Sequence, residues 1–260
     1  MNIVVCVKQV PDTAAEKKLT ASLTVDRKSV ENILNPFDEY AVEEALRIKE
    51  KIGASVTALC VGPESAKEAL RKAIAMGVEK AALVTDPAVA GSDAWSTAYV
   101  LAQALKKLQW DIALFGMQST DSLTATVPGL VAEFLGLPQH SYVSKLEVSD
   151  SEVKSNRSTE QGYDVLVSKP PVVVSVTKAI NEPRYPSLKG IMQAKKTEIT
   201  VWSLADLGVS SSQVGAAGAR TKLVSFSAAK ARQAGELVQG LTPEEAAVCI
   251  ADFLTKSKVI

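Results

Sequence analysis

The sequence has few of the residues that build metal centres, disulfides or hydrolytic triads. Three cysteines, Cys6, Cys60 and Cys249, lie far apart with no CxxC pair, and His140 is the one histidine. This pattern argues against a zinc site, and it provides no readable Ser-His-Asp or Cys-His motif. Cys6 and Cys60 lie in apolar, strand-like runs, where a thiol is usually an inert part of the core. The composition therefore predicts no catalytic residue and no metal site.

The sequence also lacks an excess of charge and a long hydrophobic run. Its 29 basic side chains balance 29 acidic ones, so nothing global points to nucleic acid or to an anionic membrane surface. No apolar run approaches the ~20 residues of a transmembrane helix, and the chain opens with a strand-like stretch rather than a signal peptide. We therefore expect a cytoplasmic protein with reduced thiols, without membrane insertion.

What is present is an alternation of short apolar runs with amphipathic segments over the first half of the chain. Parallel strands that are covered on both faces have this continuous apolar character. The runs are Ile3–Val7, Ser55–Val61, Lys80–Val84 and Asp111–Phe115, and the helical segments begin at Pro36, Glu64 and Ser92 or Asp93. The alternation predicts an α/β fold with a doubly wound, mostly parallel sheet.

The second half of the chain has a different pattern. Four strand-like stretches follow one another without intervening helices and predict an antiparallel extension of the sheet. They are Ser141–Leu146, Glu147–Asn156, Tyr163–Ser168 and Pro171–Val176. The small, polar residues Ser210–Ala219 are typical of a linker, and Thr242-Pro243 predicts the start of a helix over Glu244–Thr255. A linker and a lone helix suggest a tail that packs on another subunit.

Several loops should meet where the parallel strands end, the edge at which open α/β sheets bind ligands. Helix starts predicted at Asn35-Pro36 and near Asp121 would present free backbone N–H groups to an anion. These loops are Lys8–Asp12, Asn35-Pro36, Val61–Pro63 and the hydroxyl-rich Gly116–Val127. There is no P-loop and no GxGxxG, so the residues leave open both a nucleotide site and ordinary helix capping by Asn35 and Asp121.

A further stretch, Thr177–Lys196, is polar and irregular after an apolar strand-like run. Pro183 and Pro186 exclude helix and central strand around them. Leu188, Ile191 and Met192 then follow at helical spacing among lysines. The stretch is either a rigid loop that presents side chains to a partner or a solvated loop at the exit of a strand.

This stretch also carries a family resemblance. NEPRYPSLKGIMQAKK (Asn181–Lys196) resembles, nearly residue for residue, the β-subunit loop of electron transfer flavoproteins. Three other blocks match in the family's order: VCVKQVPD (Val5–Asp12), NPFDEYAVEEAL (Asn35–Leu46) and ALRKAIAMGVEKA (Ala69–Ala81). The resemblance implies an adenine-nucleotide-hydrolase-like α/β domain over residues 1–209. It also implies a linker and C-terminal arm over residues 210–260 that pack on a partner α subunit.

The resemblance implies two cofactors. The α subunit would supply most of an FAD site. This chain would cover one side of the isoalloxazine, with Phe37 and the Lys8–Thr13 loop nearest the flavin, and would hold an AMP. The positions that match the family's nucleotide pocket are Cys6, Asn35, Pro36, Phe37, Asp38, Val61, Gly116, Gln118, Ser119, Thr120, Asp121, Ser122, Thr124, Thr126 and Val127.

The Gly116–Val127 loop departs from the common family form. Gly116, Gln118 and Asp121 match, but the further acidic residues and an Asn-Gln-Thr run are replaced. The change removes negative charge near a phosphate and leaves hydroxyl groups, so AMP binding is still expected. An electron-bifurcating form, with a second FAD in place of AMP, is the alternative, and the loop does not match the form expected there.

The resemblance further implies an electron carrier that is not itself an enzyme and that meets several partners. Flavoprotein dehydrogenases, such as acyl-CoA dehydrogenases, would deliver electrons, and a membrane quinone oxidoreductase would accept them. Leu188 would be the apolar anchor of dehydrogenase docking, with a basic rim around it. The docking residues implied are Asn181, Glu182, Pro183, Arg184, Tyr185, Leu188, Ile191, Met192, Lys195 and Lys196.

Two alternative hypotheses, from other classes of protein, are compatible with the same kind of α/β sheet. A nucleotide-binding protein of the universal-stress type would be a homodimer without flavin, but its Gly-rich phosphate loop is not evident. An adenylate-using ligase would need an SGGxDS-like loop after the first strand, where Lys8–Thr13 reads KQVPDT. Both predict a chain that works without a different partner subunit.

Overall fold

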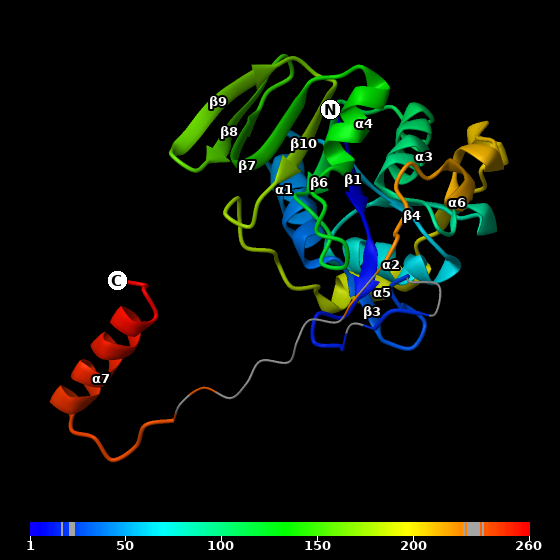
Figure 1. Ribbon diagram of the computed structural model, residues 1–260. Helices are drawn as coiled ribbons and strands as arrows, with labels where there is room; N and C mark the ends of the chain where they lie inside the picture. The colour runs from blue at the N-terminus through cyan, green and yellow to red at the C-terminus, as the bar shows by residue number, and fades with distance from the viewer. Residues whose placement is uncertain (17, 21–23, 226, 228–234, 236) are drawn as a thin grey trace. The chain divides into compact units, whose positions relative to one another are not determined.

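The computed structural model contains a nine-stranded sheet in the order β11-β5-β4-β1-β6-β10-β7-β8-β9 (Figure 1). The structure describes residues 1–16, 18–20, 24–225, 227, 235 and 237–260. These form two units, Met1–Leu223 and Val224–Ile260. The strands of the large sheet are β1 (Asn2–Val7), β4 (Ser55–Val61), β5 (Lys80–Val84), β6 (Ile112–Gly116), β7 (Gln139–Val148), β8 (Val153–Thr159), β9 (Gly162–Ser168), β10 (Val172–Val176) and β11 (Ile199–Trp202).

Helices cover both faces of the sheet, as the apolar runs predict. Alternate side chains of β1 divide between two buried clusters: Ile3 and Val5 pack with α1, α2 and α5, and Val4 and Cys6 pack with α3 and α4. The helices are α1 (Pro36–Ile52), α2 (Lys67–Met76), α3 (Ala94–Lys106), α4 (Val127–Leu135), α5 (Leu188–Lys196), α6 (Gly215–Gly218) and α7 (Pro243–Lys256). The predicted α/β class with a mostly parallel sheet is confirmed.

Helix α1 forms for reasons that are visible in its sequence. Pro36 occupies the first turn, where its missing N–H costs nothing. Acidic side chains lie in the first turn and basic ones in the last, which suits the helix dipole. Gly53 ends the helix in the left-handed conformation, with φ of 73°. The helix follows β3 (Asn32–Leu34), which pairs antiparallel with β2 (Gln9–Pro11). Its start lies against Gly116 at the end of β6, and thus at the carboxyl-terminal edge of the sheet.

The predicted antiparallel extension is correct for three strands and wrong for the fourth. Strands β7, β8 and β9 form an antiparallel meander at one end of the sheet (Figure 1). Strand β10, in contrast, lies between β6 and β7 and is parallel to both. Its side chains from Val172 to Val176 are all buried, as in a central strand. The chain leaves the parallel sheet, forms the meander, and returns to insert β10.

The predicted linker at Ser210–Ala219 is also wrong, because the structure folds these residues onto the first unit. They form a 3-10 turn (Ser211–Gln213) and the short α6, and Val214 is buried. The backbone N–H of Gly215 donates to Ser92 Oγ at 2.8 Å, and a Cβ at Gly215 would lie 2.4 Å from a backbone oxygen of Ala88. Small residues here allow close approach of two backbone segments, a role that composition alone does not distinguish from a flexible linker.

The second unit contains α7, whose bounds differ by one residue at each end from the helix predicted over Glu244–Thr255. Thr242 and Glu245 form a reciprocal capping box at its start. Among the residues that the structure describes, no helix is both long enough and apolar enough to cross a bilayer.

Candidate functional site

The strand order reverses at β1, and this defines the place where a ligand site is expected. From β1 the chain continues to β4 and β5 on one side, and later to β6 on the other. Crevices at the carboxyl ends of strands at such a switch point are the usual ligand sites of doubly wound sheets. Lys8 follows β1, Gly62 follows β4 and residues 117–126 follow β6. The start of α1 lies against the end of β6.

Asn35 is buried and links three segments at this edge: the loop after β6, the start of α1 and the residue after β1. Its side-chain Nδ2 donates to the backbone oxygen of Gln118 at 2.9 Å, and its Oδ1 accepts from the N–H of Thr120 at 3.2 Å. Its own N–H donates to the backbone oxygen of Lys8 at 2.9 Å. The predicted position before α1 is correct, but the side chain makes no helix-capping bond. Asn35 instead cross-links the loop after β6 to the start of α1.

Asp121 is the centre of an ion-pair cluster at the same edge. Lys8 Nζ lies 2.7 Å from its Oδ1, and Arg27 binds its Oδ2 through Nε and Nη2. The Asp121 side chain is 2% exposed. Burial opposes its ionisation, but Lys8 and Arg27 outweigh this and lower the pKa of Asp121 to about 2. Two cations against one carboxylate leave the cluster with a formal charge of +1.

Asp38, on α1, lies close to Gly116 at the end of β6 and is hydrogen-bonded to Lys8 of this cluster. Asp38 is buried and accepts the N–H of Lys8 at 2.8 Å. Burial raises the pKa of Asp38 to about 7, against the opposing effect of its hydrogen bonds and of the Lys8 charge. A Cβ at Gly116 would lie 2.5 Å from Asp38 Oδ1 and 2.6 Å from the backbone oxygen of Phe37. Glycine is therefore required here for the end of β6 to approach α1, whereas sequence reasoning assigned it to a cofactor.

The rest of the hydroxyl-rich loop is more open. Ser119 and Ser122 share a 2.6 Å hydrogen bond, and Lys8 Nζ donates to Ser119 Oγ at 3.2 Å. Ser122, Thr124 and Thr126 are exposed. The helix start expected near Asp121 is wrong, because Leu123 and Ala125 have φ of 54° and 53° and α4 begins only at Val127.

Not all of the predicted nucleotide residues face this edge. Cys6 is 5% exposed and packs in the apolar cluster with α3 and α4. Burial raises the pKa of its thiol well above the usual value, and likewise raises that of Cys60 to about 12. Val61, at the end of β4, is half-buried, as are Pro36 and Phe37.

Sequence reasoning placed the loop that begins at Lys8 at this edge but did not predict that Lys8 and Arg27 pair with Asp121. Lys8 is visible as the first residue after a buried strand, which is a usable signal. Arg27 lies in a polar stretch without hydrophobic periodicity, and no sequence signal indicates that it reaches Asp121, 94 residues away. Asn32 Nδ2 holds it in place by donating to the backbone oxygen of Arg27 at 2.7 Å.

A second candidate site is the segment 181–196, which exposes large apolar side chains. Tyr185 is 93% exposed, Leu188 83% and Met192 62%, and Ile191 is also exposed. Ser187 caps α5 by accepting the N–H of Gly190 at 3.0 Å. The charged rim is exposed as well, at Glu182, Lys195 and Lys196, while Pro183 is half-buried. Such a projecting apolar group with charges around it is typical of a protein contact surface.

Asn181 and Arg184 belong to this segment in sequence but face α1. Asn181 Nδ2 donates to the backbone oxygen of Tyr40 at 3.0 Å and to Glu44 at 3.1 Å. Arg184 pairs with Glu43 and Glu50. The structure thus separates the predicted docking residues into exposed ones and ones that tie the backbone to α1.

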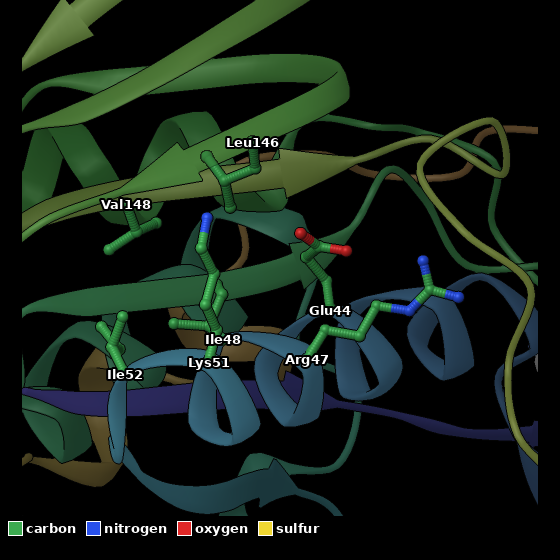
Figure 2. A pocket seen from close by; sticks show the side chains of 7 residues that line it. All are labelled: Glu44, Arg47, Ile48, Lys51, Ile52, Leu146 and Val148. Carbon is green, nitrogen blue, oxygen red and sulfur yellow. The ribbon is translucent and has the colours of Figure 1, made fainter.

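A hollow beside the carboxyl-terminal half of α1 is distinct from both sites. Figure 2 shows Leu146 and Val148 of β7 facing Ile48 and Ile52 of α1, with Glu44, Arg47 and Lys51 around them. Four of its seven lining residues are apolar, and three are charged. The anion-compatible edge lies instead at the opposite end of α1, beside Asn35 and Asp38.

Fold and edge together define a doubly wound α/β protein with an ion-pair cluster of Lys8, Arg27 and Asp121 at the switch point of its sheet. Comparisons with known proteins give its family. The electron transfer flavoprotein domain model matches residues 22–207. The chain is 43% identical to electron transfer flavoprotein subunit beta of Mycobacterium tuberculosis strain H37Rv over 267 residues, covering 100% of this chain and 99% of that protein.

Other relatives extend the match. Subunit beta of Thermoanaerobacterium thermosaccharolyticum is 42% identical, over 92% of this chain and 93% of the relative. Subunit CarD of the caffeyl-CoA reductase-Etf complex of Acetobacterium woodii is 37% identical over the full length of both. The chain belongs to the electron transfer flavoprotein β-subunit family, and the resemblance seen in its sequence is confirmed.

Proposed function

We propose that this chain binds AMP at the switch-point edge, completes the FAD site of an α subunit, and docks flavoprotein dehydrogenases through residues 181–196. Electrons would pass from the dehydrogenase through FAD to a downstream acceptor, which we take to be a membrane quinone oxidoreductase, and the heterodimer would work in the cytoplasm. The observation that carries the proposal is the arrangement on α1. This helix starts in the cationic edge and holds the exposed docking segment farther along.

The edge residues fit an adenine nucleotide phosphate. The Lys8, Arg27 and Asp121 cluster carries net positive charge. Thr124 and Thr126 are exposed hydroxyl donors in the loop that carries Asp121. Pro36 marks the start of α1, whose amino-terminal end favours negative charge. Asn35 would act by fixing the backbone of Gln118 and Thr120, so that the loop is preformed when the nucleotide arrives.

Phe37 fits the role of an apolar neighbour of the flavin ring. It is half-buried at the same edge, beside the end of β6. FAD supplies the redox chemistry when it is bound. The chain's own part would be to cover the ring, exclude water and hold it within reach of a docked dehydrogenase. No residue of the chain is proposed to transfer protons or form covalent bonds.

Cofactor analysis of the heterodimer tests this proposal. The chain is produced together with its α subunit, and FAD and AMP are extracted and quantified. One FAD and one AMP per heterodimer support the ordinary carrier. Two FAD and no AMP would replace it with the bifurcating form. A stable homodimer without flavin would replace it with the stress-type nucleotide-binding protein.

Substitution of Asn35 tests the location of the nucleotide. Asn35→Ala should lower bound AMP at least several-fold, because it removes both bonds that fix residues 118 and 120. Asn2→Ala is the matched control, since Asn2 binds Ser55 at the opposite edge of the sheet. Unchanged AMP in Asn35→Ala would contradict this location, and equal loss in both variants would indicate general instability.

A further inference from the structure

Arg184 makes an extensive set of contacts with α1. Its Nε donates to Glu43 Oε2 at 2.7 Å, and its Nη2 lies 3.2 Å from Glu43 Oε1. Its Nη1 reaches Glu50 Oε1 at 2.5 Å. The backbone N–H of Arg184 also donates to Glu43 Oε2, at 3.2 Å. Both the side chain and the backbone N–H of Arg184 are therefore bound to α1. These contacts fix the position of the backbone at residue 184 as well as the conformation of its side chain.

The key acceptor, Glu43, is inaccessible to a docked protein. Its side chain is 5% exposed, against 58% for Glu50. Arg47 donates to the same carboxylate from the turn below, at 2.9 Å. Burial opposes ionisation of Glu43, but the hydrogen bonds from Arg184 and Arg47 lower its pKa below the usual value. Glu43 is thus a charged anchor inside the molecule.

Two further contacts hold the same segment. Asn181 is bound to Tyr40, one turn before Glu43 on α1, and to Glu44, the residue after Glu43. On the other side of the exposed residues, Arg71 Nη1 of α2 donates to the backbone oxygen of Ala194 at 2.6 Å. The exposed side chains lie between these two attachments. Pro183 and Pro186 restrict the backbone between them further.

We propose that Arg184 is a positioning residue, which clamps residues 181–187 to α1 so that Tyr185 and Leu188 are presented in one preformed geometry. This inference rests on the proposed docking function. The partner is a dehydrogenase surface with an apolar pocket for Leu188 and acidic groups near Lys195 and Lys196. A preformed segment loses less conformational freedom on docking, so the clamp lowers the KM for the carrier without altering the flavin.

Two variants of the intact heterodimer test the clamp. Arg184→Gln and Glu43→Gln each remove the charge pair, and Glu43→Gln does so at a residue that no partner can touch. Both should raise the KM for the heterodimer as electron acceptor of a dehydrogenase about 10-fold, with kcat and FAD content unchanged. Both should also increase amide hydrogen exchange across residues 181–187. Arg184→Lys should recover part of the loss, since it restores the charge but not the two-carboxylate geometry.

Arg47→Gln is the matched control, because it removes the other cation on Glu43 without touching the segment. It should leave KM and exchange at residues 181–187 unchanged. A rise in KM for Arg184→Gln alone, without faster exchange and without an effect of Glu43→Gln, would overturn the inference and place Arg184 in direct contact with the partner. Leu188→Ala separates the two proposals: if it leaves KM unchanged, docking through this segment fails altogether.

Discussion

The two candidate sites, one at the start of α1 and one along its length, use polar residues in opposite ways. At the switch-point edge, side chains bind one another: Lys8, Arg27 and Ser119 converge around Asp121. In the 181–196 segment, Asn181 and Arg184 bind α1, and the apolar side chains project outward, with Leu188 83% exposed.

The difference follows from the kind of ligand that each site would take. A small anion needs converging charges and amides that are already in position, so a closed polar network suits it. A protein partner needs a projecting apolar anchor on a backbone that does not have to be ordered on binding. Removing a group from the first site should therefore change nucleotide content and stability, whereas loosening the second should change partner kinetics.

The largest expected effect is the pH dependence of the free energy of unfolding that arises from Asp38 at the switch-point edge. Its folded pKa of about 7 exceeds the ordinary value of 3.8 for an aspartate, so the folded state binds the proton more tightly. Stability contributed in this way is complete below the unfolded pKa and is lost as pH rises toward 7, by up to about 4 kcal/mol. Asp38→Asn cannot ionise, so its free energy of unfolding relative to wild type should increase between pH 4 and pH 7. Urea denaturation of both chains across this range measures it.

An exposed carboxylate provides the control. Hydrogen bonds from Ser203 lower the pKa of Asp206, so its contribution is present above the unfolded pKa and is lost only at lower pH. The difference between Asp206→Asn and wild type should be flat from pH 5 to pH 7. A flat difference for Asp38→Asn as well would show that Asp38 titrates normally.

Residues whose role is local were well predicted from the sequence. Pro36 and the charge order of α1 predict that helix, and the apolar runs predict the parallel strands. The pattern of four matching blocks also predicted the family. These features depend on neighbours within a few residues, which is the range over which hydrophobic periodicity and capping operate.

Residues that act across the chain were not predictable in the same way. Arg27 meets Asp121 over 94 residues, and Arg184 meets Glu43 over 141. Sequence spacing gives no signal for such pairs, so Arg184 was expected in the docking rim although its side chain faces α1. The same limitation explains β10, whose partners β6 and β7 are set by the path of the whole chain.

Gly116→Ala should have the next largest effect on the free energy of unfolding. Its structural effect should be confined to the switch-point edge. The new Cβ would lie 2.5–2.6 Å from Asp38 Oδ1 and from backbone atoms of Phe37, which cannot move away without shifting α1. We expect destabilisation by about 3 kcal/mol and loss of bound AMP. Gly129→Ala is the matched control, since its Cβ would meet only the flexible Gln139 side chain, at 3.2 Å. Equal stability of the two variants, measured by urea denaturation, would refute the close-approach role of Gly116.

Gly190→Ala should have the smallest effect on global stability and the more selective effect on docking. Its Cβ would lie 2.1 Å from the backbone oxygen of Ala75, so α5 must move away from the end of α2. Ala194 is the buried residue of α5, so the clash can be relieved by local opening of this helix, and we expect a loss of about 1 kcal/mol or less globally. Hydrogen exchange in Leu188–Lys196 should nevertheless rise sharply, with AMP and FAD content unchanged. Lys189→Ala, at an exposed neighbouring position, should leave exchange in α5 as it is. If Gly190→Ala instead lowered cofactor content as much as Gly116→Ala does, the switch-point edge and the 181–196 segment would not be separable sites, and the contrast between a closed polar network and a presented apolar surface would fail.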